Sequence, residues 1–261
     1  MKAPEWLRQC APLRVVAAGL RALRSQFDLG LRWIGGIGRL AGFAREYRAY
    51  RRLNAGTPFA LRGRDIFPCL LDRTAATPVD PIYFLQDTWC ARKIAARRPR
   101  AHVDIGSSAK SMAMIAQFVP VTFVDIRSVD LEVEGFSFQA GTVLALPFAD
   151  ASVPSLSSIC VIEHIGLGRY GDPVDARGSE KAAAELGRVL ARGGDLYVSV
   201  PVDAECRIYF NAHRAFTRDY LLSLFPGLTL IEEGYIYGRA LFPAYDPARG
   251  FGTGLYHLRR P

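Results

Sequence analysis

The stretch AHVDIGSSAKSMAMIAQFVPVTFVDI, residues 101–126, decides the fold of this chain. A short apolar run, 101–106, leads through a Gly-Ser-Ser turn into a helical stretch, and a second apolar run follows at 121–126. Ser107 or Ser108 can cap the helix. A strand, a glycine turn and a helix N-terminus together form an anion site, because unpaired N–H groups point at the ligand. Asp125 ends the second run, where an acid commonly accepts hydrogen bonds from ribose hydroxyls.

Further apolar runs continue this alternation and predict the architecture. They occur at 136–141, 155–164 and 195–202, and a helical stretch at 178–194 ends at a Gly-Gly turn. Two β-like stretches, 228–238 and 253–260, close the chain. The pattern predicts an α/β, Rossmann-like fold with a mostly parallel seven-stranded sheet whose last strand is reversed. A nicotinamide-dependent dehydrogenase usually continues instead into another parallel unit or a substrate domain.

The net charge of +8 comes from the first fifth of the chain. Residues 1–52 hold 11 Lys/Arg against 3 Asp/Glu, and the remainder is neutral. On a helix, five arginines and one aspartate form a polar stripe opposite apolar side chains: Arg14, Arg21, Arg24, Asp28, Arg32 and Arg39. The stripe suits an anionic membrane surface, with Trp33 near the boundary, and suits packing on a protein equally well. Nucleic-acid binding is disfavoured because aromatic residues do not interleave with the charges.

The amino-acid composition predicts three parts of the chain and indicates the cellular compartment of the protein. Residues 1–52 form a basic amphipathic helical segment, 53–100 a proline-containing connector with a lid helix, and 101–261 the α/β domain. Five dispersed cysteines without a Cys-x-x-Cys pair argue against zinc or a disulfide framework. No signal peptide and no 18-residue apolar run is visible. We expect a cytoplasmic protein that either stays soluble or sits on the inner face of the membrane.

The order and spacing of the motifs resemble class I S-adenosylmethionine-dependent methyltransferases. They are HVDIGS, VDIR, GTVLALPFADASV, VIEH and AELGRVLARGGDLYVSVP. More closely, YFLQDTWCARKI, EHIGLGRYGDPVD and YFNAHRAF resemble an uncharacterised methyltransferase-like family associated with bacterial surface-polysaccharide synthesis. The resemblance covers roughly residues 83–225 and implies S-adenosylmethionine as the cofactor.

The resemblance also implies a role for each cofactor-binding position. Four residues would border the methionine part of the cofactor: Asp104, Gly106, Ser107 and Ser108. Asp125 would hold the ribose, and Ile126 would lie against the adenine. Thr142 stands where related proteins often have an Asp that binds the adenine amino group, and this departs from the family, as does the loss of two glycines after Gly106.

The stretch EHIGLGRYGDPVD, 163–175, is the predicted acceptor loop. His164 is a candidate base for removing a proton from a hydroxyl acceptor, or else a histidine that binds loop backbone. Glu163 either touches the cofactor or caps the strand end. Tyr170 and Asp172 belong to the acceptor side, with Asp172 a further catalytic candidate, and Arg169 is available for a phosphate or carboxylate.

YFNAHRAF adds candidates at the same rim of the sheet. His213 is a second candidate base or a packed structural histidine, and Asn211 and Arg214 are predicted to bind the substrate. Asp172 and Asp175 with Glu163 could bind a divalent ion, but a metal-free site is favoured.

We therefore expect a methyltransferase that O-methylates a sugar or lipid-linked saccharide. The rival interpretation is a noncatalytic scaffold or sensor in a glycan-assembly complex, which the degraded glycine motif favours. A nicotinamide-dependent oxidoreductase ranks third, since Ser108 and Lys110 stand where its phosphate loop needs glycines. The acceptor and the oligomeric state are not predicted by the sequence.

Overall fold

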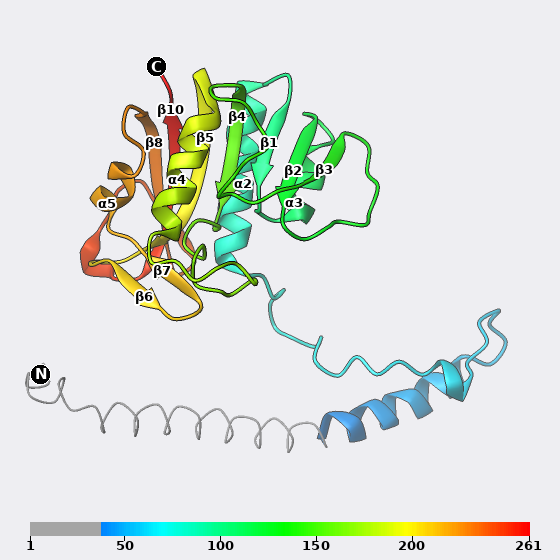
Figure 1. Cartoon of the computed structure of the whole chain (residues 1–261). Coiled ribbons are helices and arrows are strands. Elements are labelled where there is room, and N and C mark those ends of the chain that lie inside the picture. The colour runs from blue at the N-terminus through cyan, green and yellow to red at the C-terminus, as the bar shows by residue number, and fades with distance from the viewer. Residues whose placement is uncertain (1–37) are drawn as a thin grey trace, which may run out of the picture. The chain divides into compact units, whose positions relative to one another are not determined.

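A computed structural model describes residues 38–261 of the chain, which separates into two compact units with the division after Pro78 (Figure 1). The first unit, as far as it is described, contains helical residues 38–53 and a short 3₁₀ turn, η2 (Gly63–Asp65). Arg73 pairs with Glu46 at 3.0 Å within it. Of the predicted amphipathic stripe, only Arg39 falls in this range, where it is exposed; the rest lies outside the described residues. No helix within 38–261 has the length and apolarity to cross a membrane.

The second unit begins at Val79, so the helix before the first strand belongs to the α/β domain. The sequence-based prediction assigned this helix to the segment 53–100. Helix α2 (Pro81–Arg97) starts at Asp80, whose carboxylate accepts from the N–H groups of Ile82 and Tyr83, with Pro81 at the first helical position. One face of α2 is buried, and it carries Gln86, Trp89, Cys90 and Ile94.

The sheet has eight strands in the order β3-β2-β1-β4-β5-β10-β8-β9 (Figure 1). The parallel half consists of β1 (His102–Ile105), β2 (Val121–Asp125), β3 (Phe136–Ala140), β4 (Val153–Ile159) and β5 (Leu190–Val202). The chain runs outward from β1 to β3 and then returns to β4 beside β1. The switch point between β1 and β4 is where ligands bind in open sheets of this kind.

The other strands complete the predicted reversal. Strand β10 (Gly252–Arg259) runs antiparallel to both β5 and β8 (Thr229–Tyr237), so it is the reversed strand within the sheet. Strand β9 (Ala240–Phe242) adds an eighth, short strand at the edge, which was not predicted. A separate hairpin of β6 (Arg207–Tyr209) and β7 (His213–Ala215) follows β5.

Helices cover both faces of the sheet. α4 (Gly178–Val189) and α5 (Arg218–Ser223) contribute to one apolar cluster, and α2 and α3 (Ala109–Ile115) to the other. Successive strand residues alternate between the clusters: Phe123 packs with α2 and α3, whereas Val124 packs with the opposite layer. Two predicted bounds are wrong. The run 155–164 leaves the strand at Ile159, and helix 178–194 ends at Val189, where β5 begins directly.

Candidate functional site

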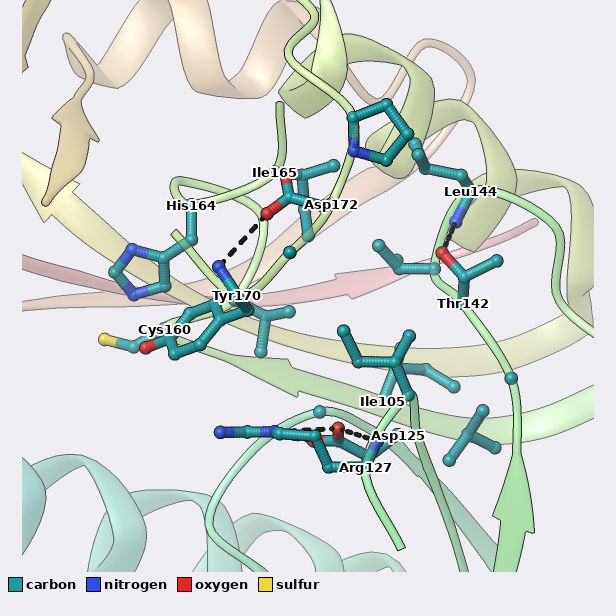
Figure 2. Close-up of a pocket in the computed structure, with 18 residues that line it drawn as sticks. Ile105, Asp125, Arg127, Thr142, Leu144, Cys160, His164, Ile165, Tyr170 and Asp172 are labelled. Carbon is teal, nitrogen blue, oxygen red and sulfur yellow. Dashed lines mark hydrogen bonds and ion pairs between the residues drawn. The ribbon is translucent and has the colours of Figure 1, made fainter. Parts of the chain in front are cut away.

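A cavity of about 460 Å³ lies at the carboxyl ends of β1, β2, β3 and β4. Its walls come from four turns that follow these strands, together with part of the acceptor loop: residues 105–106, 124–127, 141–144, 160–161, 164–165 and 170–173. Figure 2 shows Thr142 and Leu144 at one end of the cavity and His164 with Cys160 at the other. The predicted acceptor loop and the predicted cofactor site therefore share one cavity.

Asp125 ends β2 at the edge of this cavity, and it is almost fully buried. Its Oδ1 accepts from the backbone N–H of Arg127 at 2.8 Å, and the Arg127 guanidinium reaches both carboxylate oxygens at 3.3 Å (Figure 2). Arg127 was not predicted as a site residue. The sequence does contain a sign of this role: Arg127 follows the strand-end Asp125 by two residues, close enough to pair with its carboxylate.

Gly106 provides space beside Asp125. Its φ of +69° is in the left-handed region, which glycine adopts at no steric cost. A Cβ at Gly106 would lie 3.2 Å from Val161 Cγ1 and 4.0 Å from Asp125 Oδ2, and so would occupy the cavity wall. A ligand that binds Asp125 can therefore approach the backbone closely at Gly106.

Three other predicted cofactor residues do not line the cavity. Asp104 is fully buried beneath it and accepts from the N–H and Oγ of Ser107 at 3.1 and 2.7 Å. The Ser107 hydroxyl also accepts from Ile159 N–H at 2.8 Å, so it ties β1 to β4. Ser108 caps α3 by accepting from Ser111 N–H at 3.3 Å, as predicted. Asp104, Ser107 and Ser108 shape the turn rather than face a ligand.

A buried polar chain continues from Asp104 across the sheet. Ser157 donates to Asp104, and His102 contacts Ser157 and Ser155, each at 2.8 Å. Burial raises the pKa of Asp104 to about 7 and lowers the pKa of His102 to about 3. His102 is thus a neutral structural histidine at physiological pH.

The far end of the cavity is formed by the turn after β3. Thr142 lines it, and its Oγ1 accepts from the N–H of Leu144 at 3.3 Å (Figure 2). Ile126 also lines the cavity, and it is half-exposed. These groups offer a hydroxyl and apolar contacts to a ligand at this end of the cavity.

His164 lies at the opposite end and has a defined hydrogen-bonding state. Its Nδ1 is 2.7 Å from the carbonyl oxygen of Ala212, which can only accept, and 3.3 Å from Nη1 of Arg169, which can only donate. The shorter contact needs a proton on Nδ1, and Arg169 Nη1 donates to the Ala212 carbonyl instead, so we assign the proton to Nδ1. Nε2 has no hydrogen-bond partner among residues 38–261; Glu163 Oε1 is 3.6 Å away. Burial and the nearby Arg169 lower the pKa of His164 to about 4, so the ring is neutral at pH 7. A neutral ring with a free Nε2 is the form that accepts a proton.

Glu163 is buried rather than exposed to the cavity. Within the described chain, its Oε2 has no hydrogen-bond partner, and burial raises its pKa to about 8. Beside it, Gln86 of α2 accepts from Cys160 Sγ at 3.1 Å and from Ser199 Oγ at 3.0 Å. Gln86 and Cys160 were missed because each stands within an apolar pattern, so the sequence gives no signal for this polar cluster.

Tyr170 closes the cavity from the acceptor loop. Two guanidinium groups lie over its ring, Arg127 at 4.9 Å and Arg169 at 5.0 Å from the ring centre, within the range of cation–π attraction. Arg127 also pairs with Asp125, and Arg169 donates to the Ala212 carbonyl at 2.9 Å. Tyr170 therefore connects the Asp125 side of the cavity with the His164 side.

Asp172 lines the cavity, but its carboxylate maintains the loop. Its oxygens accept from the N–H groups of Gly166 at 2.5 Å and Tyr170 at 3.3 Å, so the prediction of a catalytic Asp172 is not supported. Asp175 pairs with Lys181 at 2.6 Å. With Glu163 buried, these three acids do not converge, and no group of metal ligands is found within 38–261.

The predicted substrate residues after β5 separate into two kinds. Arg214 is buried and donates to the carbonyls of Ile165 and Asp175 at 2.6 and 3.1 Å, so it supports the acceptor loop from below and does not face a substrate. Asn211 is exposed at the β6–β7 turn. His213 stands beside His164 with ring centres 6.5 Å apart, and burial lowers its pKa.

Comparisons with known proteins place the fold. A family model described as a Caenorhabditis protein of unknown function, DUF268, matches residues 149–235, and no curated protein matches the sequence. The chain is similar to the N-methyltransferase NodS of Bradyrhizobium japonicum WM9 in complex with S-adenosyl-L-homocysteine, at 17% identity and a TM-score of 0.52 over 70% of this chain and 89% of that one. It is also similar to a putative sarcosine dimethylglycine methyltransferase of Galdieria sulphuraria, at 13% identity and a TM-score of 0.51 over 68% and 85%.

A third similar structure limits what can be inferred about the reaction from the fold. The [4+2]-cyclase SpnF matches at 14% identity with a TM-score of 0.50, over 67% of this chain and 81% of that one. At these identities the likeness concerns the fold: the chain has the Rossmann-like methyltransferase fold. Because a cyclase shares it, the reaction has to be argued from the side chains.

Proposed function

We propose that the protein is an S-adenosylmethionine-dependent methyltransferase that methylates a hydroxyl group on a sugar or lipid-linked saccharide. The observation that carries the proposal is the arrangement of one cavity, with the Asp125 carboxylate and glycine-bordered space on one side and a neutral His164 with free Nε2 at one end. The similarity to NodS, which was solved with S-adenosyl-L-homocysteine, supports the choice of cofactor.

The described residues fit this cofactor. Asp125 offers two acceptors for ribose hydroxyls once the Arg127 side chain moves aside, and the missing Cβ at Gly106 leaves room for the ligand next to the backbone. Ile126 and Leu144 give apolar contacts for a flat base, with the Thr142 hydroxyl as a polar partner. When bound, the cofactor supplies an electrophilic methyl group on a sulfonium.

His164 has the geometry of a general base. Its protonated Nδ1 is fixed by Ala212, so Nε2 is the atom that takes the proton from an acceptor hydroxyl. Arg169 donates to the same carbonyl and holds that carbonyl and the loop together. Most of the remaining rate enhancement would come from holding the acceptor in line, since displacement at a methyl group depends strongly on orientation.

The test is isothermal titration with S-adenosylmethionine on the intact protein and two variants. Asp125→Ala removes the ribose acceptor, and Asp130→Ala removes a neighbouring exposed acid as a matched control. We expect micromolar binding that is lost in Asp125→Ala and kept in Asp130→Ala. Binding that survives in Asp125→Ala would contradict the assignment.

The second candidate is a noncatalytic scaffold or sensor, which the Arg127 pair on Asp125 favours because it satisfies the carboxylate without a ligand. No binding of S-adenosylmethionine to the intact protein would move this candidate to first place. The sugar acceptor rests on the resemblance to a family associated with surface polysaccharides, and formation of S-adenosylhomocysteine with candidate sugars tests it.

We also propose that residues 1–52 place the protein on an anionic membrane surface. The support is their charge of 11 Lys/Arg against 3 Asp/Glu. Co-sedimentation with vesicles of phosphatidylglycerol, compared with phosphatidylcholine vesicles and a chain lacking residues 1–37, measures this attraction. Equal sedimentation with both vesicle types would exclude it.

A further inference from the structure

A chain of aromatic rings leads from the cavity onto the β6–β7 hairpin. Tyr170 and His164, which both line the cavity, have ring centres 5.6 Å apart, and His164 is followed by His213 at 6.5 Å. His213 in turn lies 5.1 Å from Tyr209 and 5.5 Å from Phe251. The rings come from three segments that are distant in sequence and meet beside the candidate base.

The outer three rings form a platform, which we call the aromatic rim: Tyr209, His213 and Phe251. Tyr209 is 38% and Phe251 43% exposed, although they pack against each other at 5.7 Å. The Tyr209 hydroxyl donates to the buried Asp203 at 3.2 Å, which fixes the ring in place. The rim adjoins the cavity through His213, whose ring lies beside that of the cavity-lining His164. Large aromatic side chains that are held in position and left half-exposed beside a cavity indicate a binding surface.

A positive charge stands between the rim and the cavity. Arg169 forms no ion pair with any carboxylate in residues 38–261, whereas Arg207 on the same hairpin pairs with Glu205 at 2.7 Å and with Asp203 at 3.6 Å. Arg169 donates through Nη1 to the Ala212 carbonyl, which leaves donors on its other nitrogens. A guanidinium with free donors is suited to a phosphate group.

We propose that the aromatic rim and Arg169 bind the methyl acceptor, and that this acceptor is a sugar ring carrying a phosphate group. This proposal rests on the proposed function and specifies the substrate class. The apolar C–H face of the sugar lies on the rim, its phosphate pairs with Arg169, and one hydroxyl reaches Nε2 of His164. The exposed side-chain amide of Asn211, at the hairpin turn, is available to the remaining hydroxyls.

The tilt of the rings favours a sugar over a flat aromatic acid. The rim rings meet at 49°, 36° and 84°, so no two of them form a parallel slot into which a flat ring could insert. Aromatic ligands gain most from offset stacking or edge contacts within such slots. An open platform beside hydroxyl-binding groups instead suits a puckered ring with one apolar face.

The experiment measures binding of hexose 1-phosphates to the full chain by saturation-transfer difference NMR, with and without S-adenosylhomocysteine. The probes are glucose, galactose, mannose and N-acetylglucosamine 1-phosphates. We expect transfer to the sugar ring C–H protons for at least one of them. Tyr209→Ala and Phe251→Ala are each expected to weaken that binding about tenfold, because each removes one of the rings on which the sugar lies. Phe118→Ala, which removes a half-exposed ring near the amino end of β2, is the matched control and should leave binding unchanged.

The competitors separate the two halves of the proposal. Arg169→Gln should reduce the affinity of the sugar phosphate to that of the corresponding methyl glycoside, which lacks phosphate. Failure of all four sugar phosphates to bind, equal displacement by inorganic phosphate alone, or tighter binding of 4-hydroxybenzoate would each overturn the proposal. Calorimetry with S-adenosylhomocysteine on the same samples distinguishes these outcomes from failure of the cofactor site.

Discussion

His164 and Ala212 are joined by a hydrogen bond of 2.7 Å between the imidazole Nδ1 and the backbone carbonyl oxygen, across 48 residues of sequence. The bond fixes the tautomer of His164 and connects the turn after β4 to the β6–β7 hairpin. Because the acceptor is a backbone carbonyl, substitution of the Ala212 side chain does not remove it. The orientation of the candidate base therefore depends on the conformation of the hairpin.

The first prediction concerns His164 itself. His164→Gln removes the proton acceptor and leaves the Asp125 side of the cavity unchanged, so S-adenosylmethionine affinity should stay within about twofold while methyl transfer falls about 10²–10⁴-fold. Calorimetry and a product assay measure the two quantities separately. His213→Gln removes a ring of the aromatic rim, so it should weaken acceptor binding and leave the rate at saturating acceptor largely unchanged. An equal loss of that saturated rate in His213→Gln would contradict the assignment of His164 as the base.

Arg169 should contribute to the low pKa of His164. Burial is the main cause of the low pKa of His164, and the Arg169 charge lowers it further. Arg169→Gln should therefore raise the pKa of His164 from about 4 toward the ordinary value near 6.5. NMR titration of the His164 ring protons measures this shift. An unchanged midpoint would show that burial alone sets the protonation state.

Arg127 is expected to compete with the ribose for Asp125. Because its guanidinium is largely exposed, the pair contributes at most about 1 kcal/mol. Arg127→Gln should therefore tighten S-adenosylmethionine binding by about two- to fivefold. Arg192→Gln, which removes one exposed positive charge elsewhere, controls for net charge. Weaker binding in Arg127→Gln would instead assign Arg127 to the bound state.

Glu163 makes stability depend on pH in a defined direction. The pKa of Glu163 is raised from 4.5 to about 8 in the folded chain. The protonated side chain therefore contributes to the free energy of unfolding fully below pH 4.5, and this stabilisation is lost as the pH rises to 8. The stability of Glu163→Gln relative to the unsubstituted protein should therefore increase by a few kcal/mol across that window, since one pKa unit corresponds to about 1.4 kcal/mol. Denaturant unfolding at pH 4.5, 6 and 8 measures it. If the difference in free energy of unfolding between the two proteins is the same at all three pH values, the buried carboxylate has a partner that stabilises its charge.

Arg214 should matter for folding more than for substrate. It donates to the Ile165 and Asp175 carbonyls and to Ser179 Oγ from a buried position. Arg214→Ala should cost about 2–4 kcal/mol of unfolding free energy, because buried acceptors lose a charged donor. Arg207→Ala, on the exposed hairpin, should cost less than 1 kcal/mol. Chemical denaturation compares the two.

The parts of this fold that follow local rules were predictable. Strands β1, β2 and β3 agree with the apolar runs to within a residue, and Ser108 caps α3, because alternation and capping are properties of neighbouring residues. The end of β4 was not predictable. Cys160 adopts φ +54° within an apolar run, and its contact with Gln86 of α2 becomes visible only when the helix is packed.

The candidate site shows the same division. Asp125 and His164 were placed at the site by their positions at strand ends, Ile126 and Thr142 by the family resemblance, and Tyr170 by its place in the acceptor loop. All five line the cavity. Asp172 and Arg214 were assigned to chemistry because polar residues in a glycine-bearing loop look alike in sequence. Whether such a side chain faces a ligand or holds the loop depends on backbone acceptors and donors, here Ile165, Gly166 and Asp175, that no residue type reveals.

The position of β10 has a consequence for how the chain is made. It lies between β5 and β8 and pairs along its whole length with both. During translation, β8 and β9 leave the ribosome before the strand that connects them to the rest of the sheet exists. The edge of β5 therefore stays open until residues 252–259 emerge, and a nascent chain interrupted before them exposes two unpaired strand edges, which are templates for aggregation. The sheet is thus expected to close only after residues 252–259 emerge, when the cavity-forming strands β1 to β4 are already outside the ribosome.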